Sequence, residues 1–298
     1  MLPEIFRIPG LNLPIHGYGL MIVVGFLSST WMGTREARRR GLPDFVYDLA
    51  FVMLLSGILG GRLFYYVENY RKEFSHRSIL AFFEIWKGGL VFYGGGILGT
   101  AGSLAYLLKK KYPLGECLDA VAPFVLVGMG FGRIGCLLNG CCYGRPCGEG
   151  FPLGIIYPSI NNPASETPNS PAFLDQLRTG IVTESDPFAI PVYPTQLFEA
   201  GYDFIACAAL AWYLRGQVPR AIGFPLIFMV YGIGRFCLEF LRGDNPATPT
   251  SLTISQNVSL GLVAISGGLF ILLYRKGLKG PEGILRKIYK KPLTNPTK

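Results

Sequence analysis

Long apolar segments, separated by short polar loops, dominate this chain. Half of its residues are hydrophobic and only 16% are charged, well below the roughly 25% charge of an average soluble domain. A helix of about 20 apolar residues is long enough to cross a bilayer. The pattern therefore predicts an all-α integral membrane protein with seven transmembrane helices, near Tyr18–Gly33, Phe45–Val67, Gly89–Leu108, Cys117–Leu138, Pro194–Leu214, Ala221–Leu241 and Ser255–Tyr274.

The remaining segments complete the predicted organisation. Residues 1–17 alternate prolines with isolated apolar residues and are interpreted as a strap along the membrane surface, without a cleavable signal peptide. Residues 18–139 hold helices one to four and residues 194–274 hold helices five to seven. The stretch between them, 140–193, is too long for a plain connection and predicts a small external cap. Residues 275–298 form a basic tail.

Lysine and arginine are distributed unevenly between the two sides of these spans. Most of the 28 follow the first, third and fifth spans or lie in the tail, so the positive-inside rule favours an external N-terminus and a cytoplasmic C-terminus. The net charge of +9 is then typical of cytoplasmic loops against anionic lipid. It does not indicate a nucleic-acid surface, and we expect no nucleic-acid partner.

In this orientation the polar residues of each span lie near its outer end, with Asp119 and Asp203 as the main exceptions. A channel or transporter would continue its polar residues across the membrane or gather them at the midplane. Two arginines, Arg133 and Arg235, lie at similar depth in different spans. Because guanidinium groups form strong bidentate hydrogen bonds to phosphate, we interpret the two arginines as a phosphate-binding site open to the outer leaflet.

Simpler explanations exist for both arginines. Arg133 could be a structural charge that pairs with a carboxylate, and Arg235 has Glu239 one helical turn away. Gln196 and Glu199 share a face at the start of the fifth span and are further candidates for the site. A stripe of small residues beside Arg133 predicts close approach of a second helix, and it comprises Gly128, Gly132, Cys136 and Gly140.

The cysteines and histidines exclude several kinds of chemistry. Only His16 and His76 are present, which disfavours a hydrolase of the Ser/His/Asp type. Four cysteines near the cap lack a CxxC pair, so we expect no metal site and no cofactor; they are Cys136, Cys141, Cys142 and Cys147. A disulfide between Cys147 and Cys141 or Cys142, or small buried side chains, are the alternatives.

The motif GRIGCLLNGCCYGR, from Gly132 to Arg145, resembles the signature of prolipoprotein diacylglyceryl transferases. Similar elements follow the same order along the chain: the Tyr18-Gly19 entry, GGRLFYYVEN, FYGGGILG, YPTQLFEA and GRFCLEFLRGDNP. The resemblance implies a seven-span enzyme of the bacterial cytoplasmic membrane. Such an enzyme moves the diacylglyceryl group of phosphatidylglycerol onto the lipobox cysteine of a prolipoprotein signal peptide and releases glycerol phosphate.

Carried onto this chain, the resemblance implies that Arg133 binds the lipid phosphate and that Arg235 is a second essential arginine. It also assigns importance to four other matching positions: Tyr18, Asn139 and Gly144, which we expect to bind substrate, and Glu239, which we expect to be catalytic. Some members have histidine, proposed to activate the thiol, where Tyr93 stands, and also where Tyr193 stands. We therefore expect Tyr93 to orient the thiol or relay its proton to a phosphate oxygen or to Glu239.

Two other functions remain open at this point. One is a catalytically silent relative that binds phosphatidylglycerol, which the missing histidine motivates. The other is a transporter of lipid head groups, which would require polar residues deeper in the spans. Product formation distinguishes the transferase from both.

Overall fold

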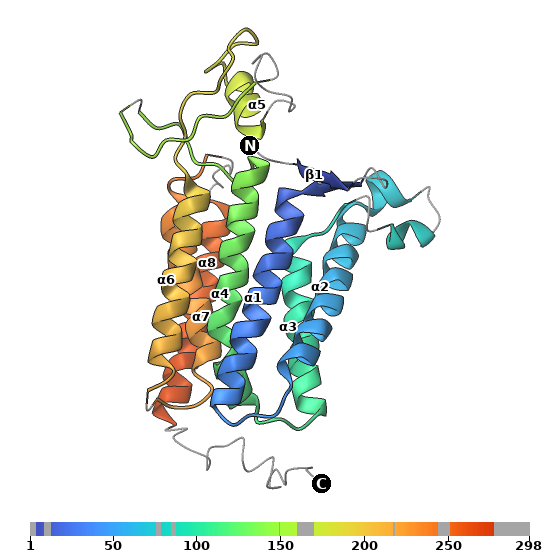
Figure 1. The fold of residues 1–298 in the computed structure, drawn as a ribbon, viewed down its shortest axis with the longest axis vertical. Helices are drawn as coiled ribbons and strands as arrows, with labels where there is room; N and C mark the ends of the chain where they lie inside the picture. The colour runs from blue at the N-terminus through green and yellow to red at the C-terminus, as the bar shows by residue number, and fades with distance from the viewer. Residues whose placement is uncertain are drawn as a thin grey trace. The chain divides into compact units, whose positions relative to one another are not determined.

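The computed structural model describes residues 4–8, 13–75, 79–84, 88–148, 150–159, 170–216, 218–243 and 251–276. The predicted basic tail from residue 277 onward lies outside these residues, as do parts of the strap and of the cap. The helical fold class is confirmed (Figure 1). Each predicted span contains a helix: α1 (Gly17–Arg39), α2 (Val46–Glu68), α3 (Phe92–Lys109), α4 (Leu114–Asn139), α6 (Thr195–Tyr213), α7 (Gly223–Glu239) and α8 (Ile254–Arg275). Within the described chain α2, α4 and α8 are long and apolar enough to cross a membrane.

The strap contains strands that the sequence pattern did not predict. Strands β1 (Glu4–Ile8) and β2 (Leu13–His16) pair in antiparallel fashion, and β2 leads directly into α1. Pro14 lies opposite Arg7 in this pair. Proline is tolerated there because each strand of a two-stranded sheet has an outer edge that needs no ladder hydrogen bond.

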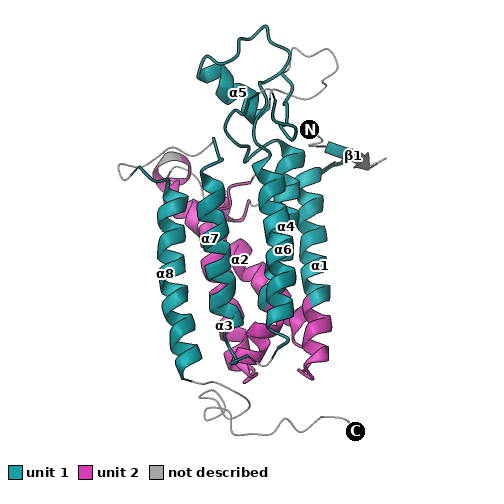
Figure 2. Ribbon diagram, turned by 90° about the vertical axis from the view of Figure 1, so that its left-hand side faces the viewer, with its two compact units in different colours: residues 1–32, 122–277 teal, residues 33–121, 278–298 magenta. Residues whose placement is uncertain are grey.

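The chain divides into two compact units (Figure 2). Unit 2 comprises residues 33–121 and 278–298. In it α2 and α3 pack closely at Gly60 and Gly94, because neither residue has a side chain. A Cβ on Gly60 would collide with the backbone at Gly94, and one on Gly94 would collide with the backbone at Gly60. Arg62 is 3% exposed and donates hydrogen bonds to backbone carbonyls in the segment that leads to α3, at Ala81 (2.8 Å), Phe82 (2.7 Å) and Gly88 (2.8 Å).

Unit 1 comprises residues 1–32 and 122–277 and contains most of α4 together with α6, α7 and α8. The predicted close approach along the small-residue stripe is confirmed where α1 meets α4, because a Cβ on Gly25 would lie 3.1 Å from the carbonyl oxygen of Gly128. Leu126, Leu210 and Ile222 belong to the apolar core that joins α4, α6 and α7.

The cap belongs to the same unit and has its own small core. Its helix α5 (Pro171–Arg178) begins at Ser170, whose hydroxyl accepts a hydrogen bond from the backbone N–H of Phe173. Phe173 and Tyr157 are buried in the cap core. Figure 1 shows the cap beyond the ends where α4 finishes and α6 begins, and the candidate site residues lie at these ends.

Candidate active site

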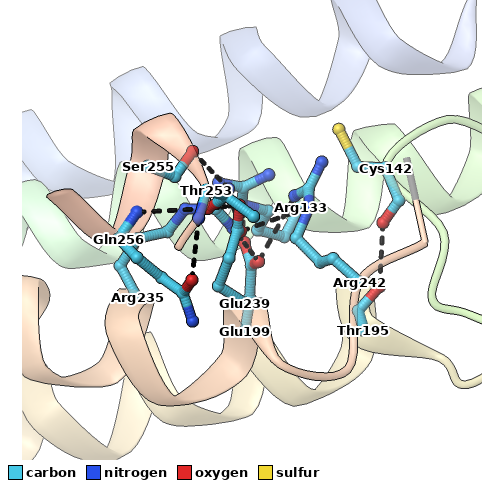
Figure 3. A network of polar contacts seen from close by, with 10 residues as sticks. All are labelled: Arg133, Cys142, Thr195, Glu199, Arg235, Glu239, Arg242, Thr253, Ser255 and Gln256. Atoms are coloured by element: carbon cyan, nitrogen blue, oxygen red, sulfur yellow. Dashed lines mark hydrogen bonds and ion pairs between the residues drawn. The ribbon is translucent and has the colours of Figure 1, made fainter. Parts of the chain in front are cut away.

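The predicted site residues of α4, α6 and α7 meet in a buried cluster of charges (Figure 3). Arg133 of α4 pairs through Nε with Oε2 of Glu199 of α6. Arg235 of α7 lies between two carboxylates, with Nη1 2.6 Å from Oε1 of Glu199 and Nη2 2.6 Å from Oε2 of Glu239. Glu199 therefore joins arginines from two helices.

Both simpler explanations considered for the arginines are present in the structure. Arg133 pairs with a carboxylate, and Arg235 pairs with Glu239 one turn along α7. The pairs are not isolated, however, because Glu199 connects them. Such a network fixes the guanidinium groups in place, and their remaining N–H donors are available to an anion.

Two residues at the start of α8, the N-cap Thr253 and Ser255, form hydrogen bonds to the cluster (Figure 3). Thr253 is the N-cap of α8 and donates a hydrogen bond of 2.6 Å from its hydroxyl to Oε1 of Glu239. The same hydroxyl accepts a hydrogen bond from the backbone N–H of Gln256 in a capping box. Arg235 donates to the hydroxyl of Ser255 at 3.2 Å. The start of α8 thus holds both partners of the α7 ion pair.

Arg242 also belongs to the cluster, although the sequence pattern placed it in an outer loop. Its Nη1 is 3.5 Å from Oε1 of Glu199 and its Nε is 3.7 Å from Oε2 of Glu239, with a side chain only 6% exposed. The spacing of three from Glu239 is the signal that could have identified it. In the described ion pairs, three guanidinium groups thus share the carboxylates of Glu199 and Glu239.

Arg133 is the most accessible of the three arginines. Its side chain is 20% exposed, against 11% for Arg235 and 6% for Arg242. The phosphate-binding role expected of Arg133 requires such access, and it stays a prediction.

Gln196 and Gly144 shape the site through the backbone. Gln196 is 1% exposed, and its Nε2 donates to the carbonyl of Cys141 (2.8 Å) and to the hydroxyl of Tyr157 (3.0 Å). Gly144 lies against two chain segments, and its N–H donates to the carbonyl of Tyr193 at 3.0 Å. It also forms a bridge with Arg242, so it places that arginine beside the cluster. Substrate contact by these two residues stays a prediction.

Tyr18 and Asn139 lie near the same end of α4. Tyr18 packs beside Gly135, where an added Cβ would lie 3.1 Å from the tyrosine ring, and 42% of the residue is exposed. Asn139 donates a hydrogen bond to Sγ of Cys141 at 3.6 Å. Tyr93 belongs to unit 2, in the first turn of α3, and is 50% exposed. Its role toward the thiol stays a prediction.

The cysteines after α4 are close together, but they form no disulfide. All seven cysteines are free, so the disulfide considered for Cys147 is wrong. The Sγ atoms of Cys136, Cys141 and Cys142 lie within 4.8 Å of one another. Hydrogen bonds from Cys136 and Cys141 lower the pKa of Cys142 against the effect of burial, and the charges of Arg242 and Arg133 lower it further.

We expect replacement of Gly144 by alanine to destabilise the protein. A Cβ at this position would lie 2.5 Å from the carbonyl oxygen of Tyr193 and 2.8 Å from that of Leu241, so two backbone segments must move. Overpacking of this kind costs about 1–3 kcal/mol, and the thermal midpoint in detergent should fall. Gly148→Ala is the matched control, because nothing lies within 4 Å of a Cβ there. Equal midpoints for the two variants would refute the prediction.

These features define a class of protein: a helical, membrane-type protein whose buried arginine–glutamate cluster has the charge to hold an anion. The sequence model described as prolipoprotein diacylglyceryl transferase matches residues 3–273, and the chain belongs to this family. The resemblance found in the motifs is thereby confirmed, and it places the chain among transferases.

Individual relatives agree with this membership. The chain is 34% identical over 272 residues to the phosphatidylglycerol–prolipoprotein diacylglyceryl transferase of Clostridium tetani, covering 91% of this chain and 96% of the relative. The sequence identity to phosphatidylglycerol–prolipoprotein diacylglyceryl transferase 2 of Clostridium perfringens is 33% over 282 residues, covering 94% of this chain and 96% of the relative. For the enzyme of Mycobacterium leprae (strain Br4923) it is 31% over 303 residues, with coverage of 97% and 87%.

Proposed function

We propose that this protein transfers the diacylglyceryl group of phosphatidylglycerol to the lipobox cysteine of prolipoproteins, at the outer leaflet of the bacterial cytoplasmic membrane. The observation that carries the proposal is the cluster in which Glu199 holds Arg133, Arg235 and Arg242 together. Guanidinium groups gathered in this way are well suited to binding a lipid phosphodiester. The names of the relatives contain the same two substrates, phosphatidylglycerol and prolipoprotein.

An apolar cavity of about 550 Å³ lies in unit 1 along α1, α4 and α6, and it supports a lipid substrate. Phe131 and Phe204 line it, and it continues to Trp212 and Arg215 near the other end of α6. Phe204 follows Glu199 by five residues, which is about 7 Å along a helix. An acyl chain of a lipid whose phosphate lies at Arg133 would extend in this direction. The volume is within the usual range of ligand pockets.

The reaction is an alkyl transfer. The peptide thiol loses its proton, a sulfur–carbon bond forms at the glycerol carbon, and the carbon–oxygen bond to the phosphate breaks. Glycerol phosphate leaves with the electron pair of that bond and an added negative charge. Arg133 and Arg235, held by Glu199 and Glu239, stabilise this charge without having to reorient.

Proton removal is the second requirement, since a free thiol has a pKa near 8.5 and reacts as thiolate. We expect Tyr93 to orient the thiol or to relay its proton. Glu239 is fully buried at its side chain and already accepts a hydrogen bond from Thr253. Its main role in the reaction is to hold the guanidinium group of Arg235 in place.

The test is an assay with purified protein in detergent, phosphatidylglycerol and a synthetic lipobox peptide. Mass spectrometry should show the peptide gaining one diacylglyceryl unit, and a matched peptide with serine in place of the cysteine should gain none. Bound phosphatidylglycerol without product would indicate a silent lipid-binding relative. Movement of lipid between leaflets without product would indicate a transporter.

We expect Tyr93→Phe to slow transfer about tenfold or more, because proton transfer by a positioned group contributes at least that much in most enzymes. The assay above measures the rate. Tyr47→Phe is the control, since Tyr47 is also an exposed tyrosine of unit 2, at 58%. An unchanged rate in Tyr93→Phe would limit the ring to packing.

The proposed orientation places the cap outside and the C-terminus inside. We expect alkaline phosphatase fused after Arg178, at the end of α5, to be active in cells. We expect green fluorescent protein fused after Lys298 to fluoresce, because each reporter works only on its own side of the membrane. The reverse pattern would invert the orientation and move the site to the inner leaflet.

A further inference from the structure

The turn after α4 brings three thiols to one point beside the arginine–glutamate cluster. Gly140 has a φ of +74°, the left-handed conformation that ends many helices. The N–H of Gly140 donates to the carbonyl of Leu137 (3.2 Å), and that of Cys141 donates to the carbonyl of Cys136 (3.1 Å). This Schellman arrangement folds the chain back over the last turn of α4. Residues five and six positions after Cys136 thereby return to it.

We propose that Cys136, Cys141 and Cys142 form a binding site for one soft metal ion, with monovalent copper as the ion that fits best. The three Sγ atoms already lie within 4.8 Å of one another. A metal–sulfur bond of about 2.3 Å places the sulfurs of a three-coordinate thiolate site about 4 Å apart. Small rotations of the side chains would close the remaining distance.

The backbone of this turn is fixed before any ion arrives. The carbonyl of Cys142 accepts a hydrogen bond from the hydroxyl of Thr195 at 2.8 Å, and that of Cys141 accepts one from Gln196 at 2.8 Å. Cys142 has a φ of +60°, which is uncommon for a residue with a side chain. Gln196 and Thr195 are buried in the first turn of α6. A turn held in this way presents its thiols without further ordering, which favours binding.

The chemistry of the three ligands selects the ion. Thiolates are soft ligands that suit monovalent copper and zinc. Structural zinc sites almost always have four protein ligands, whereas this group has three. Binding releases the thiol protons, and a three-thiolate complex of monovalent copper retains two negative charges. Arg133 and Arg242 lie close enough to interact with Cys142 and would balance these charges.

The predicted absence of a metal site rested on sequence spacing, because CxxC pairs are the usual signature. Here the turn, and not a repeated spacing, brings the ligands together. The same turn is bonded to the start of α6, which also carries Glu199. An ion at this site would therefore stiffen the link between the ends of α4 and α6.

The experiment is a titration of the purified full chain with monovalent copper, under argon and with a phosphine reductant, against a chromogenic copper chelator. We expect one ion per chain, and X-ray absorption at the copper edge should show three sulfur neighbours. Cys136→Ser, Cys141→Ser and Cys142→Ser should each weaken binding by more than about 100-fold, because even outer-shell changes cost 10–100-fold. Cys237→Ser is the control, since Cys237 is exposed on α7.

The X-ray absorption spectrum of the unmodified protein tests the proposal even if a cysteine variant does not fold. Failure of that protein to compete for copper, or a spectrum with nitrogen or oxygen neighbours only, would overturn the proposal. Equal loss of affinity in Cys237→Ser and in the three cluster variants would overturn it as well. The transfer assay is separate, so a negative result here leaves the proposed function untouched.

Discussion

Arg133→Ala should lower the rate of diacylglyceryl transfer by about 100- to 1000-fold, the usual effect of removing one donor that stabilises charge developing in a transition state. Arg133 is the most accessible arginine of the cluster, at 20% exposure of its side chain. Its loss would leave the departing phosphate without its first contact. The defect should appear in the rate at saturating lipid as well as at low lipid, because the interaction strengthens as the phosphate gains charge.

Arg133→Lys separates the shape of the group from its charge. Lysine keeps the positive charge but lacks the planar fork that can hold Glu199 and a phosphate together, so we expect only partial recovery. Arg178→Ala is the matched control, because Arg178 is exposed at the end of α5 in the same unit. Rates and lipid affinities are measured by the peptide assay and by lipid retention on the purified protein. Near-normal transfer in Arg133→Ala would remove this residue from the site.

The seven long helices of this protein could be predicted from the sequence because each is a largely apolar run that ends at polar or glycine-containing loops, whereas the short cap helix α5 was not predicted. The helix at each predicted span begins or ends within a few residues of the predicted bounds, as for α4 (Leu114–Asn139) and α8 (Ile254–Arg275). The pairing of β1 with β2 was missed because prolines in residues 1–17 conceal the alternation that identifies strands.

The core of the candidate site was predictable because charges inside apolar segments are rare and therefore conspicuous. Arg133, Arg235, Glu199 and Glu239 were all identified in this way, and the structure brings them together. Arg242 was not identified, since it lies just past the end of α7, where a basic residue needs no special explanation. Its low exposure depends on the tertiary contact with Gly144, and no local pattern reveals such a contact.

The cysteine cluster shows a different limit of sequence reasoning. Its geometry depends on left-handed conformations at Gly140 and Cys142 and on hydrogen bonds from α6. The left-handed conformation of Gly140 is suggested by the sequence, because glycine is common at helix ends. The hydrogen bonds come from residues more than 50 positions away. The spacing of the cysteines alone therefore pointed to a disulfide or to separate buried side chains.

Glu199→Gln should be the most destabilising single change in the cluster. Glu199 contacts all three arginines, and its carboxylate is the only group that joins Arg133 to the other two among the described ion pairs. Removing one partner of a buried ion pair costs about 3–5 kcal/mol, because the remaining charges stay buried without compensation. Arg133 would lose its described ion pair, whereas Arg235 and Arg242 would keep Glu239.

Unfolding in detergent, followed by circular dichroism as temperature rises, measures this effect. Glu68→Gln is the control, since Glu68 is exposed at the end of α2. Inorganic phosphate gives a second measurement: Glu199→Gln removes one negative charge from the cluster, so added phosphate should raise its thermal midpoint more than that of the unmodified protein. A variant that melts like the unmodified protein, with the same response to phosphate, would mean that Glu199 does not hold the arginines together in solution.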